Sequence, residues 1–596
     1  MKFSGFKSWL QNERFVRYLS TLSFLLSFVI ILVSIFDLGF KHGEYEERQL
    51  RDFYFIALSV GFISILVRHF IFDLKHRVKV NIFDSVLGVL LGLLLLMRID
   101  ILRENFLLLE YINKMVFVYL AGLIFFIREF STFELNFNRT SLNPAQLFIA
   151  SFLSLILIGT ALLMLPKASV DNISFIDALF TATSSVCVTG LIVVDTGSYF
   201  TVFGQSIILV LMQLGGLGIM TFASYFSYFF RGETSYENQI MLKDVTSSEK
   251  IGEVLSVLKK ILFITVIFEF IGFVLIYFSL SKNEISEISD RLFFSVFHAV
   301  SGFCNAGFST LEQSLYDPAF RFNYPLHLVI AILFILGGIG FPILLNLYRY
   351  VIYLFKNKLL EITKKRKSVH SPWVINLNTR IVIYTTTALL ILGTTVFYFF
   401  EYNNTLAEHN WFGKIVTSFF GAATPRTAGF NTVDTGALNF STMMIIFLLM
   451  WIGASPASTG GGIKTSTIAV ATLNFLSLAK GKNRIEVYKR EISESTIRRA
   501  FAIISLSLMV IGISIFLIAS FDGDKTLLSI AFEAFSAYST VGLSTGITGD
   551  LSFPSKLVII FTMFIGRVSM LTIMIAMLRR VRHLNYRYPK DEILIN

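Results

Sequence analysis

The sequence has few charged residues and few polar stretches of any length. Charged side chains make up 15% of the 596 residues and apolar side chains 54%, and the mean hydropathy is +0.69. A chain of this composition is too apolar to fold in water around a single core. Long apolar runs recur from end to end, and a helix needs about 20 apolar residues to span the hydrocarbon of a bilayer. We therefore expect an all-α integral membrane protein.

The sequence also lacks the residue clusters that enzymes use. It has no His-Glu-x-x-His pair, no serine in a strand-turn-helix signal and no cysteine-histidine cluster. Because an active site needs a convergent nucleophile, base or set of metal ligands, we expect no enzymatic activity. The spacing of the two cysteines, Cys187 and Cys304, leaves a disulfide open without favouring one. No Gly-x-Gly-x-x-Gly follows a strand, so the chain is not expected to bind a dinucleotide itself.

The net charge of +11 is explained by topology. Basic residues gather between or after apolar runs, in the segments 356–380, 480–499 and 579–587. A nucleic-acid-binding protein would instead gather them on a folded polar surface, so no nucleic acid is expected as a partner. The positive-inside rule assigns these segments and the N-terminus to the cytoplasmic face.

Four membrane helices are expected before residue 140, near 17–40, 53–72, 82–98 and 114–128. The first is not followed by a small-residue cleavage site, so it is interpreted as a retained helix and not as a signal peptide. These residues carry no motif that indicates a function.

From about residue 143 one pattern occurs four times: a long apolar helix, a shorter helix, a glycine-bearing turn and a second long helix. A phenylalanine stands ten residues before each glycine, and small residues stand eight and six before it. The aligned glycines are Gly190, Gly307, Gly429 and Gly542, spaced by 117, 122 and 113 residues. Similarity at a nearly fixed period is the signature of a repeat architecture.

The pattern divides the chain into five predicted segments. They are an N-terminal four-helix membrane extension at 1–140, pore repeats at 141–252, 253–372 and 373–492, and a fourth pore repeat with a cytoplasmic tail at 493–596. We expect the four helix, pore-loop, helix repeats to surround a central pore.

Physical chemistry indicates what such a pore would pass. Backbone that leaves helical geometry at membrane depth must be buried in protein or line a water-filled cavity. Inward carbonyls can replace the water shell of a cation, and glycine permits the backbone angles that this requires. The short helices would point their negative C-terminal ends at the same cavity. A small monovalent cation is therefore the predicted cargo.

Four stretches resemble the filters of the Trk/Ktr/HKT superfamily of K⁺ transporters. They are Thr183–Leu191 with Val194–Gly197, Phe303–Phe308, Thr424–Asn431 and Ser539–Gly546. The likeness spans about 143–582, and the first filter is closer to the KtrB branch than to TrkH. It implies potassium uptake across the bacterial inner membrane by a homodimer with one pore per protomer. It also implies a separate cytoplasmic nucleotide-binding regulatory subunit, similar to TrkA or KtrA.

The resemblance carries over to individual residues. The implied K⁺ selectivity filter consists of Val188, Thr189, Gly190, Asn305, Ala306, Gly307, Thr427, Ala428, Gly429, Thr540, Val541 and Gly542. The choice between K⁺ and Na⁺, and coupling of the flux to Na⁺ or H⁺, stay open because they depend on carbonyl positions that a sequence does not fix.

A glycine-rich run interrupts the second long helix of the third repeat. In the family the matching segment is an intramembrane gating loop, here with Gly453, Ser455, Ser458, Thr459, Gly460, Gly461, Gly462 and Lys464. A plain kink packed against its neighbour is the alternative. The run lacks the Gly-Lys-Ser/Thr ending of a phosphate-binding loop.

Three further residues leave two interpretations each. Arg567, a charge inside the last long helix, either contacts the gating loop or only ties helix ends together. The family often has Gly-Pro where this chain has Ser569-Met570, which leaves the local bend open. Arg426 either tunes the outer mouth or braces its turn, and Glu533 either attracts cations or pairs locally.

A different class of transporter is the main competing prediction. An ion-coupled secondary transporter of a small organic solute, or of Na⁺, also uses broken helices. Such proteins usually break two related helices and place polar or charged residues at the midplane. Here the breaks are fourfold and nearly uncharged.

Overall fold

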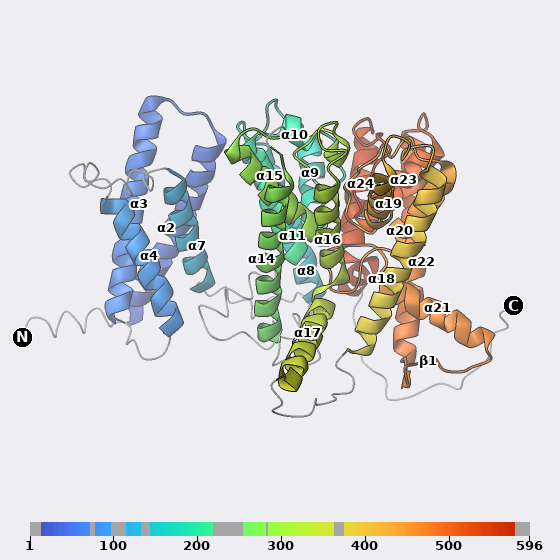
Figure 1. Ribbon diagram of the computed structural model, residues 1–596. Coiled ribbons are helices and arrows are strands. Elements are labelled where there is room, and N and C mark those ends of the chain that lie inside the picture. Colours follow the sequence, from blue (N-terminus) through green and yellow to red (C-terminus); the bar gives the residue numbers. More distant parts are fainter. Residues whose placement is uncertain are drawn as a thin grey trace, which may run out of the picture.

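The computed structural model describes residues 13–71, 78–96, 115–132, 144–218, 254–281, 284–362 and 375–577. Helices dominate these residues, as Figure 1 shows. Part of the predicted basic segment 356–380 and all of 579–587 lie outside the described residues.

Helices form along the whole described chain. In order they are α2 (Glu13–Gly39), α3 (Glu44–Ile71), α4 (Val78–Leu96), α7 (Met115–Thr132), α8 (Pro144–Leu163), α9 (Phe175–Cys187), α10 (Thr196–Tyr199), α11 (Val202–Leu217), α14 (Val254–Ser279), α15 (Ile288–Cys304), the 3₁₀ turn η3 (Ser314–Tyr316), α16 (Tyr324–Ile339), α17 (Phe341–Ile362), α18 (Leu377–Glu401), α19 (Trp411–Ala423), α20 (Phe440–Trp451), α21 (Thr465–Ala479), α22 (Glu494–Phe521), α23 (Leu527–Ser539), α24 (Phe553–Val568) and α25 (Met570–Met577).

Several of these helices have the length and composition of membrane spans. Six described helices are apolar and long enough to cross a bilayer, and the number rises to eight if each of two bent pairs counts as one span. Large apolar side chains such as Phe270 and Phe278 remain exposed on the outer surface of the molecule. Because an apolar surface of this kind is unfavourable in water, it indicates contact with lipid.

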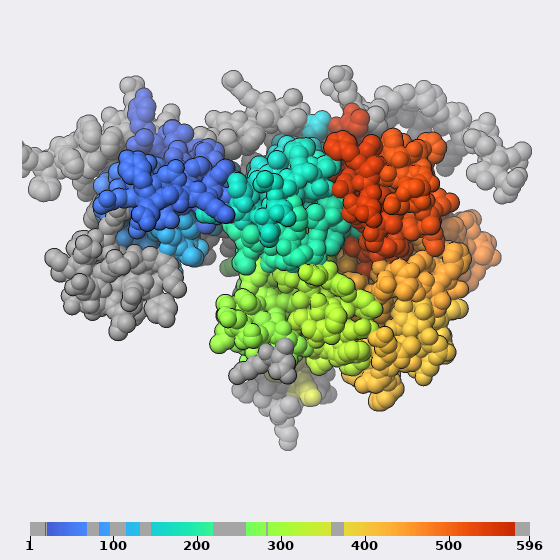
Figure 2. All heavy atoms as spheres, turned by 90° about the horizontal axis from the view of Figure 1, so that it is seen from above, coloured from blue at the N-terminus to red at the C-terminus, as the bar shows by residue number. Residues whose placement is uncertain are grey.

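Helices α2, α3, α4 and α7 form a bundle beside the rest of the molecule, blue in Figures 1 and 2. Ile30, Leu91 and Phe125 are fully buried in its core. Arg128 joins α7 to α4 by two hydrogen bonds to Asp84, of 3.0 and 2.8 Å. Helices thus occupy all four stretches in which they were predicted before residue 140.

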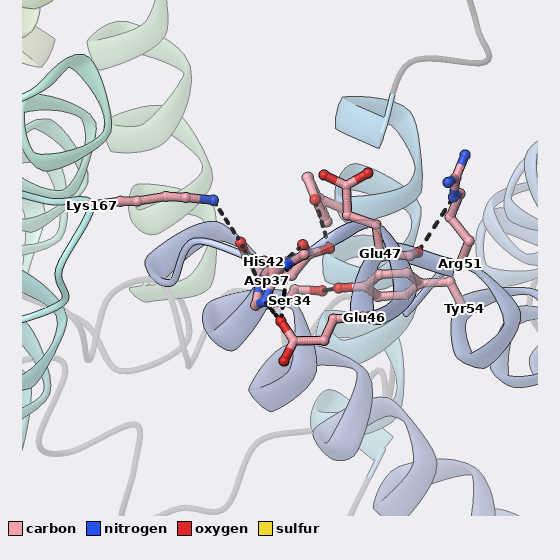
Figure 3. Close-up of polar contacts among 10 residues, drawn as sticks. Ser34, Asp37, His42, Glu46, Glu47, Arg51, Tyr54 and Lys167 are labelled. Atoms are coloured by element: carbon pink, nitrogen blue, oxygen red, sulfur yellow. Dashed lines mark hydrogen bonds and ion pairs between the residues drawn. The ribbon is translucent and has the colours of Figure 1, made fainter. Parts of the chain in front are cut away.

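The bundle is joined to α8 through the turn that follows α2, shown in Figure 3. The backbone N–H of Lys167 donates to the Gly39 carbonyl at 3.0 Å, and the Lys167 ammonium donates to the Asp37 carbonyl at 3.3 Å. The Asp37 carboxylate in turn accepts a hydrogen bond from Tyr119 at 2.8 Å and lies 3.6 Å from the His42 ring. This polar turn ties the bundle to the helix that precedes the first short helix.

The remaining helices form four similar groups arranged about one centre. A short helix, α9, α15, α19 or α23, follows a long one and packs against it in each group. The second long helix of each group, α11, α16 or α20, then packs on the short helix of the following group. The last one, α24, packs on α9 of the first group. The ring of groups is therefore closed, and Figure 2 shows the four groups as cyan, green, orange and red sectors in chain order.

Polar caps fix where the short helices begin. Ser174, Asn410 and Thr526 each accept a hydrogen bond from the backbone N–H three residues later, at the first turns of α9, α19 and α23. A side chain that satisfies one of the free N–H groups of a first turn stabilises a helix by about 1 kcal/mol. The other short helix, α15, begins after Glu287 without such a bond.

In three groups the second helix ends at a residue with positive φ. The α11 helix ends at Gly218, and α16 and α17 meet at Gly340 with a bend of 103°. The α24 and α25 helices meet at Ser569 with a bend of 86°, although Ser569 has a φ of +75° that favours glycine. The bend left open by the sequence is therefore present, at a serine in strained backbone.

One short hairpin departs from the all-α prediction. Strands β1 (Glu486–Val487) and β2 (Arg490–Glu491) pair in antiparallel register between α21 and α22, with Glu486 opposite Glu491. The turn residues Tyr488 and Lys489 both have positive φ, which reverses the chain within two residues. The hairpin lies in the predicted basic segment 480–499.

Candidate functional site

The four short helices lead into loops of the same unusual backbone. In each loop the residue two before the aligned glycine has left-handed φ, and so does the glycine itself. The φ values are +57° at Val188, +59° at Asn305, +74° at Thr427 and +48° at Thr540, and the glycines lie between +71° and +93°. Three of these four residues are β-branched, for which this conformation is costly, so the surrounding structure must hold it.

The loops meet around a single centre. A Cβ added to Gly190 would collide with the Ala306 carbonyl oxygen of the second loop. In the same way a Cβ on Gly307 would lie 2.8 Å from the Ala428 carbonyl oxygen. A Cβ on Gly429 would collide with the Val541 carbonyl, and one on Gly542 with the Thr189 carbonyl of the first loop. Each glycine thus abuts a carbonyl of the next loop, and the four contacts close into a ring. All twelve predicted filter residues lie in these four loops.

The small residues six positions before the glycines have a structural reason. The Ser184 and Ser536 hydroxyls accept the backbone N–H of Gly190 and Gly542, each at 3.1 Å. The Ser301 hydroxyl instead donates to the Phe308 carbonyl at 2.7 Å. Ala423 has no hydroxyl, and its neighbour Thr424 donates to the Phe430 carbonyl at 2.6 Å in its place. These bonds hold each loop to the helix before it.

A cavity of about 500 Å³ lies beside the glycines, and residues that follow them in each loop form its walls. All four glycines line it, together with the acidic residues Asp195, Glu312 and Asp434. Asp195 and Asp434 are held in place, since each accepts a backbone N–H of its own loop, from Ser198 at 2.7 Å and from Gly436 at 2.9 Å. Carboxylates around such a cavity raise the local concentration of cations.

The break after α20 is an irregular segment, residues 452–464, and not a simple kink. It folds back on itself, because Ile452 and Ile463 pair as neighbouring strands do and the N–H of Ala454 donates to the Gly461 carbonyl at 3.3 Å. The Ser458 hydroxyl donates to the Ser455 carbonyl at 2.6 Å. Backbone groups that would be unpaired in a broken helix are thus bonded within the segment.

This segment packs directly against the second, third and fourth loops, and none of its residues lines the cavity. A Cβ on Gly460 would collide with the Thr427 hydroxyl, and one on Gly461 with the Thr540 hydroxyl. The Thr459 hydroxyl lies 3.0 Å from the Asn305 side-chain oxygen and 3.3 Å from the Phe303 carbonyl. Only glycine permits this close approach at 460 and 461, which accounts for the glycine-rich sequence.

Arg567 connects the segment to two helices. Its guanidinium donates to the Thr459 carbonyl, and also to the Gly215 carbonyl at 2.6 Å and the Gly216 carbonyl at 3.3 Å, at the C-terminal end of α11. Arg567 therefore contacts the irregular segment, and it does not only tie helix ends together. The charge is satisfied by carbonyls that a broken helix leaves free.

Of the other two residues with open interpretations, Arg426 bonds outside its own turn and Glu533 bonds locally. Arg426 is buried and lies 3.5 Å from both the Gly453 carbonyl and the Thr386 hydroxyl, so it contacts the 452–464 segment and not the outer mouth. Glu533 is fully buried and accepts hydrogen bonds from Ser544 and Thr548, at 2.5 and 2.8 Å. It pairs locally. Cys187 and Cys304 are buried free thiols.

One polar pair near the site was missed at the sequence level. Glu269 of α14 accepts a hydrogen bond from the Gln213 side chain of α11 at 3.1 Å, and the Cys304 thiol lies 3.8 Å from its other oxygen. Gln213 stands one turn from the carbonyls that Arg567 uses. The available signal was that Glu269 is the only charged residue in the apolar run 261–279.

Comparisons with known proteins identify the family of this chain. Residues 113–583 match the TrkH family model, described as a cation transport protein. The potassium/sodium uptake protein NtpJ of Enterococcus hirae is 35% identical over 467 residues, which cover 77% of this chain and 98% of that protein. The Ktr system potassium uptake protein B of Bacillus subtilis is 36% identical over 456 residues, covering 76% of this chain and 96% of that protein.

A solved structure shares the fold. The potassium transporter TrkH from Vibrio parahaemolyticus matches with a TM-score of 0.57 at 16% identity, and the match covers 82% of this chain and 96% of that chain. The chain therefore belongs to the TrkH family of cation transport proteins and is a multi-pass protein of the plasma membrane.

Proposed function

We propose that this protein takes up K⁺ through a pore whose selectivity filter is formed by backbone carbonyls of the four glycine loops. The observation that carries the proposal is the closed ring in which Gly190, Gly307, Gly429 and Gly542 each abut a carbonyl of the next loop. In such a ring the carbonyl oxygens replace the water shell of a dehydrated cation. On this proposal residues from about 141 onward are four pore repeats in one chain.

The electrostatics around the loops favour a cation at their centre. The helices α9, α15 and α23 end directly before Val188, Asn305 and Thr540, so their negative ends face the ring. The acidic residues of the outer cavity, among them Asp195 and Asp434, attract cations to its entrance. Both effects favour a positive ion and disfavour an anion.

The segment 452–464 is the proposed gate. Gly460 and Gly461 touch Thr427 and Thr540 at the inner ends of the loops, so the segment obstructs the path there in this conformation. Arg567 holds it shut through the Thr459 carbonyl. Opening requires that this contact be released and the segment move aside.

The proposed cargo is K⁺, with Na⁺ as an ion to be tested alongside it. The names of the relatives support this order, since two are potassium uptake proteins of Ktr systems and one is a potassium/sodium uptake protein. The carbonyl ring supports either ion, because selectivity depends on finer geometry.

Uptake of ⁸⁶Rb⁺ by a K⁺-uptake-deficient bacterium, with and without Na⁺, tests the proposal. The protein should restore uptake, and Gly307→Ser should lose discrimination between K⁺ and Na⁺ because the new side chain enters the ring. Gly512→Ser is the matched control, since nothing lies within 4 Å of a Cβ at that exposed position in α22. Uptake that needs an organic solute would indicate a secondary transporter instead.

We further propose a homodimer regulated by a cytoplasmic nucleotide-binding subunit. The exposed basic segment with the β1–β2 hairpin is a surface on which such a subunit can dock, since Lys482 and Arg484 are largely exposed. Co-purification with a nucleotide-binding protein from the same membrane tests this. Charge reversal at both residues should weaken the association, and unchanged association would exclude this surface.

A further inference from the structure

The cationic side chains at the gate bind an uninterrupted row of backbone carbonyls. Arg567 donates to the Thr459 carbonyl. The Lys464 ammonium donates to the next two carbonyls, of Gly460 at 2.7 Å and of Gly461 at 3.4 Å. Three successive carbonyl oxygens of the gating segment are therefore occupied by positive charge.

The position of Lys464 is unfavourable for a purely structural lysine. It is the N-cap residue of α21, where the helix dipole is positive, and its side chain makes no capping bond. Within the described part of the chain no aspartate or glutamate forms an ion pair with it. Its charge is compensated by the two glycine carbonyls, between helices of a membrane protein, where an uncompensated charge is costly.

The same carbonyls lie immediately inside the filter. Gly460 and Gly461 are the residues that touch the Thr427 and Thr540 hydroxyls at the inner ends of the loops. A cation that leaves the filter inward meets this row first. An ammonium group carries the same single charge as K⁺ and is close to it in size, and carbonyls that solvate one can solvate the other.

We propose that the carbonyls of Thr459, Gly460 and Gly461 form an inner site for a monovalent cation, which the Lys464 ammonium occupies as a tethered blocker in this conformation. This inference rests on the proposed function. Release of Lys464 frees the site for the transported ion, so gate opening exchanges a bound side-chain cation for a mobile one. Gly462, with a φ of +67°, supplies the backbone freedom between Gly461 and Lys464.

Rb⁺ efflux from proteoliposomes that contain only this protein is the first test. Lys464→Met removes the charge at similar length and should raise the leak at least about threefold, which corresponds to about 0.65 kcal/mol. Lys464→Arg keeps the charge and should leak less than Lys464→Met. Lys464→Gln serves if the methionine variant does not fold, and Lys480→Met, at the other end of α21, is the control. If Lys464→Met leaks no more than the unsubstituted protein, the proposal is overturned.

Thallium anomalous scattering is the second test and does not depend on flux. In Lys464→Met a Tl⁺ peak should appear beside the Gly460 and Gly461 carbonyls, and the unsubstituted protein should lack it. A Tl⁺ peak at the glycine ring in both proteins, without the inner peak in the variant, overturns the inner site and leaves the proposed pore intact. Absence of the peak at the ring in both would instead contradict the proposed function.

Discussion

The N-terminal bundle and the four helix groups are both built from packed apolar helices, but their backbones differ. In the described bundle α2, α3, α4 and α7 run without a break, and every described residue with positive φ lies at or after Val188. Irregular backbone is tolerated at membrane depth only where protein or water satisfies it. Its concentration in the helix groups therefore marks where the molecule has a task beyond folding.

The comparison with relatives divides the chain near the same point, but it includes α7 of the bundle together with the helix groups. The family match begins at residue 113, after α2, α3 and α4. The bundle is joined to the first group through Asp37, Gly39 and Lys167 at one turn. We therefore expect transport to be sensitive to small changes in the helix groups and tolerant of the same changes in the bundle.

Glycine substitution should give the largest difference between the two regions. Gly542→Ala places a methyl group against the Thr189 carbonyl at a φ of +93°, and left-handed backbone alone costs about 1–2 kcal/mol. Rb⁺ uptake should fall by at least about tenfold. Gly88→Ala in the bundle meets only Ile65, at 3.8 Å, and should leave uptake unchanged at equal expression. Equal losses in both variants would remove the distinction.

The Glu269–Gln213 pair should give the next largest effect. Glu269→Leu leaves the Gln213 amide without its acceptor, which costs about 1–3 kcal/mol when buried. Because Gln213 precedes the carbonyls that hold Arg567, uptake should fall about fivefold. Glu269→Gln keeps an acceptor and should retain more uptake than Glu269→Leu. Indistinguishable uptake of the two variants would show that the hydrogen bond is not what matters.

Loss of a single hydrogen bond sharpens the comparison further. Ser184→Ala removes the acceptor for the Gly190 N–H, and Tyr119→Phe removes the donor to Asp37. Each should lower stability by about 0.5–1.5 kcal/mol. Only Ser184→Ala should also lower Rb⁺ uptake, by about threefold, since only it loosens one of the four glycine loops. Thermal unfolding and uptake measured on the same preparations separate the two effects.

Relief of strain at Ser569 should give the smallest effect. Ser569→Gly removes the cost of a side chain at a φ of +75° and should raise the apparent melting temperature by about 2 °C. Ser505→Gly, at an exposed position in the interior of α22, should lower it, because glycine destabilises a helix interior by about 0.5–1 kcal/mol. A decrease in both variants would show that Ser569 is not strained.

The elements that could be predicted from the sequence are those whose pattern is local and repeated. The spacing of the glycines and of the small residues before them located all four loops, because each loop must satisfy the same backbone constraints. The exception in the third loop, where Thr424 takes over from Ala423, needed the structure, since the pattern identifies a position and not the partner of its side chain.

Contacts between segments that lie far apart in the chain could not be predicted from the sequence. Arg567 was identified as an intramembrane charge, but its acceptors Gly215 and Gly216 lie more than 350 residues earlier. The same is true of the Glu269–Gln213 pair and of Lys167 with Asp37. The β1–β2 hairpin was missed because its strands, Glu486–Val487 and Arg490–Glu491, are too short to show an alternating pattern.

The most direct test of the account is where a bound ion lies among the four loops. Crystals grown with Rb⁺ should give an anomalous peak on the common axis, in contact with the carbonyls of Thr189, Ala306, Ala428 and Val541. Loss of that peak in Gly307→Ser, with the fold intact, would strengthen the assignment. A peak away from the ring, in a protein that still takes up Rb⁺, would contradict it.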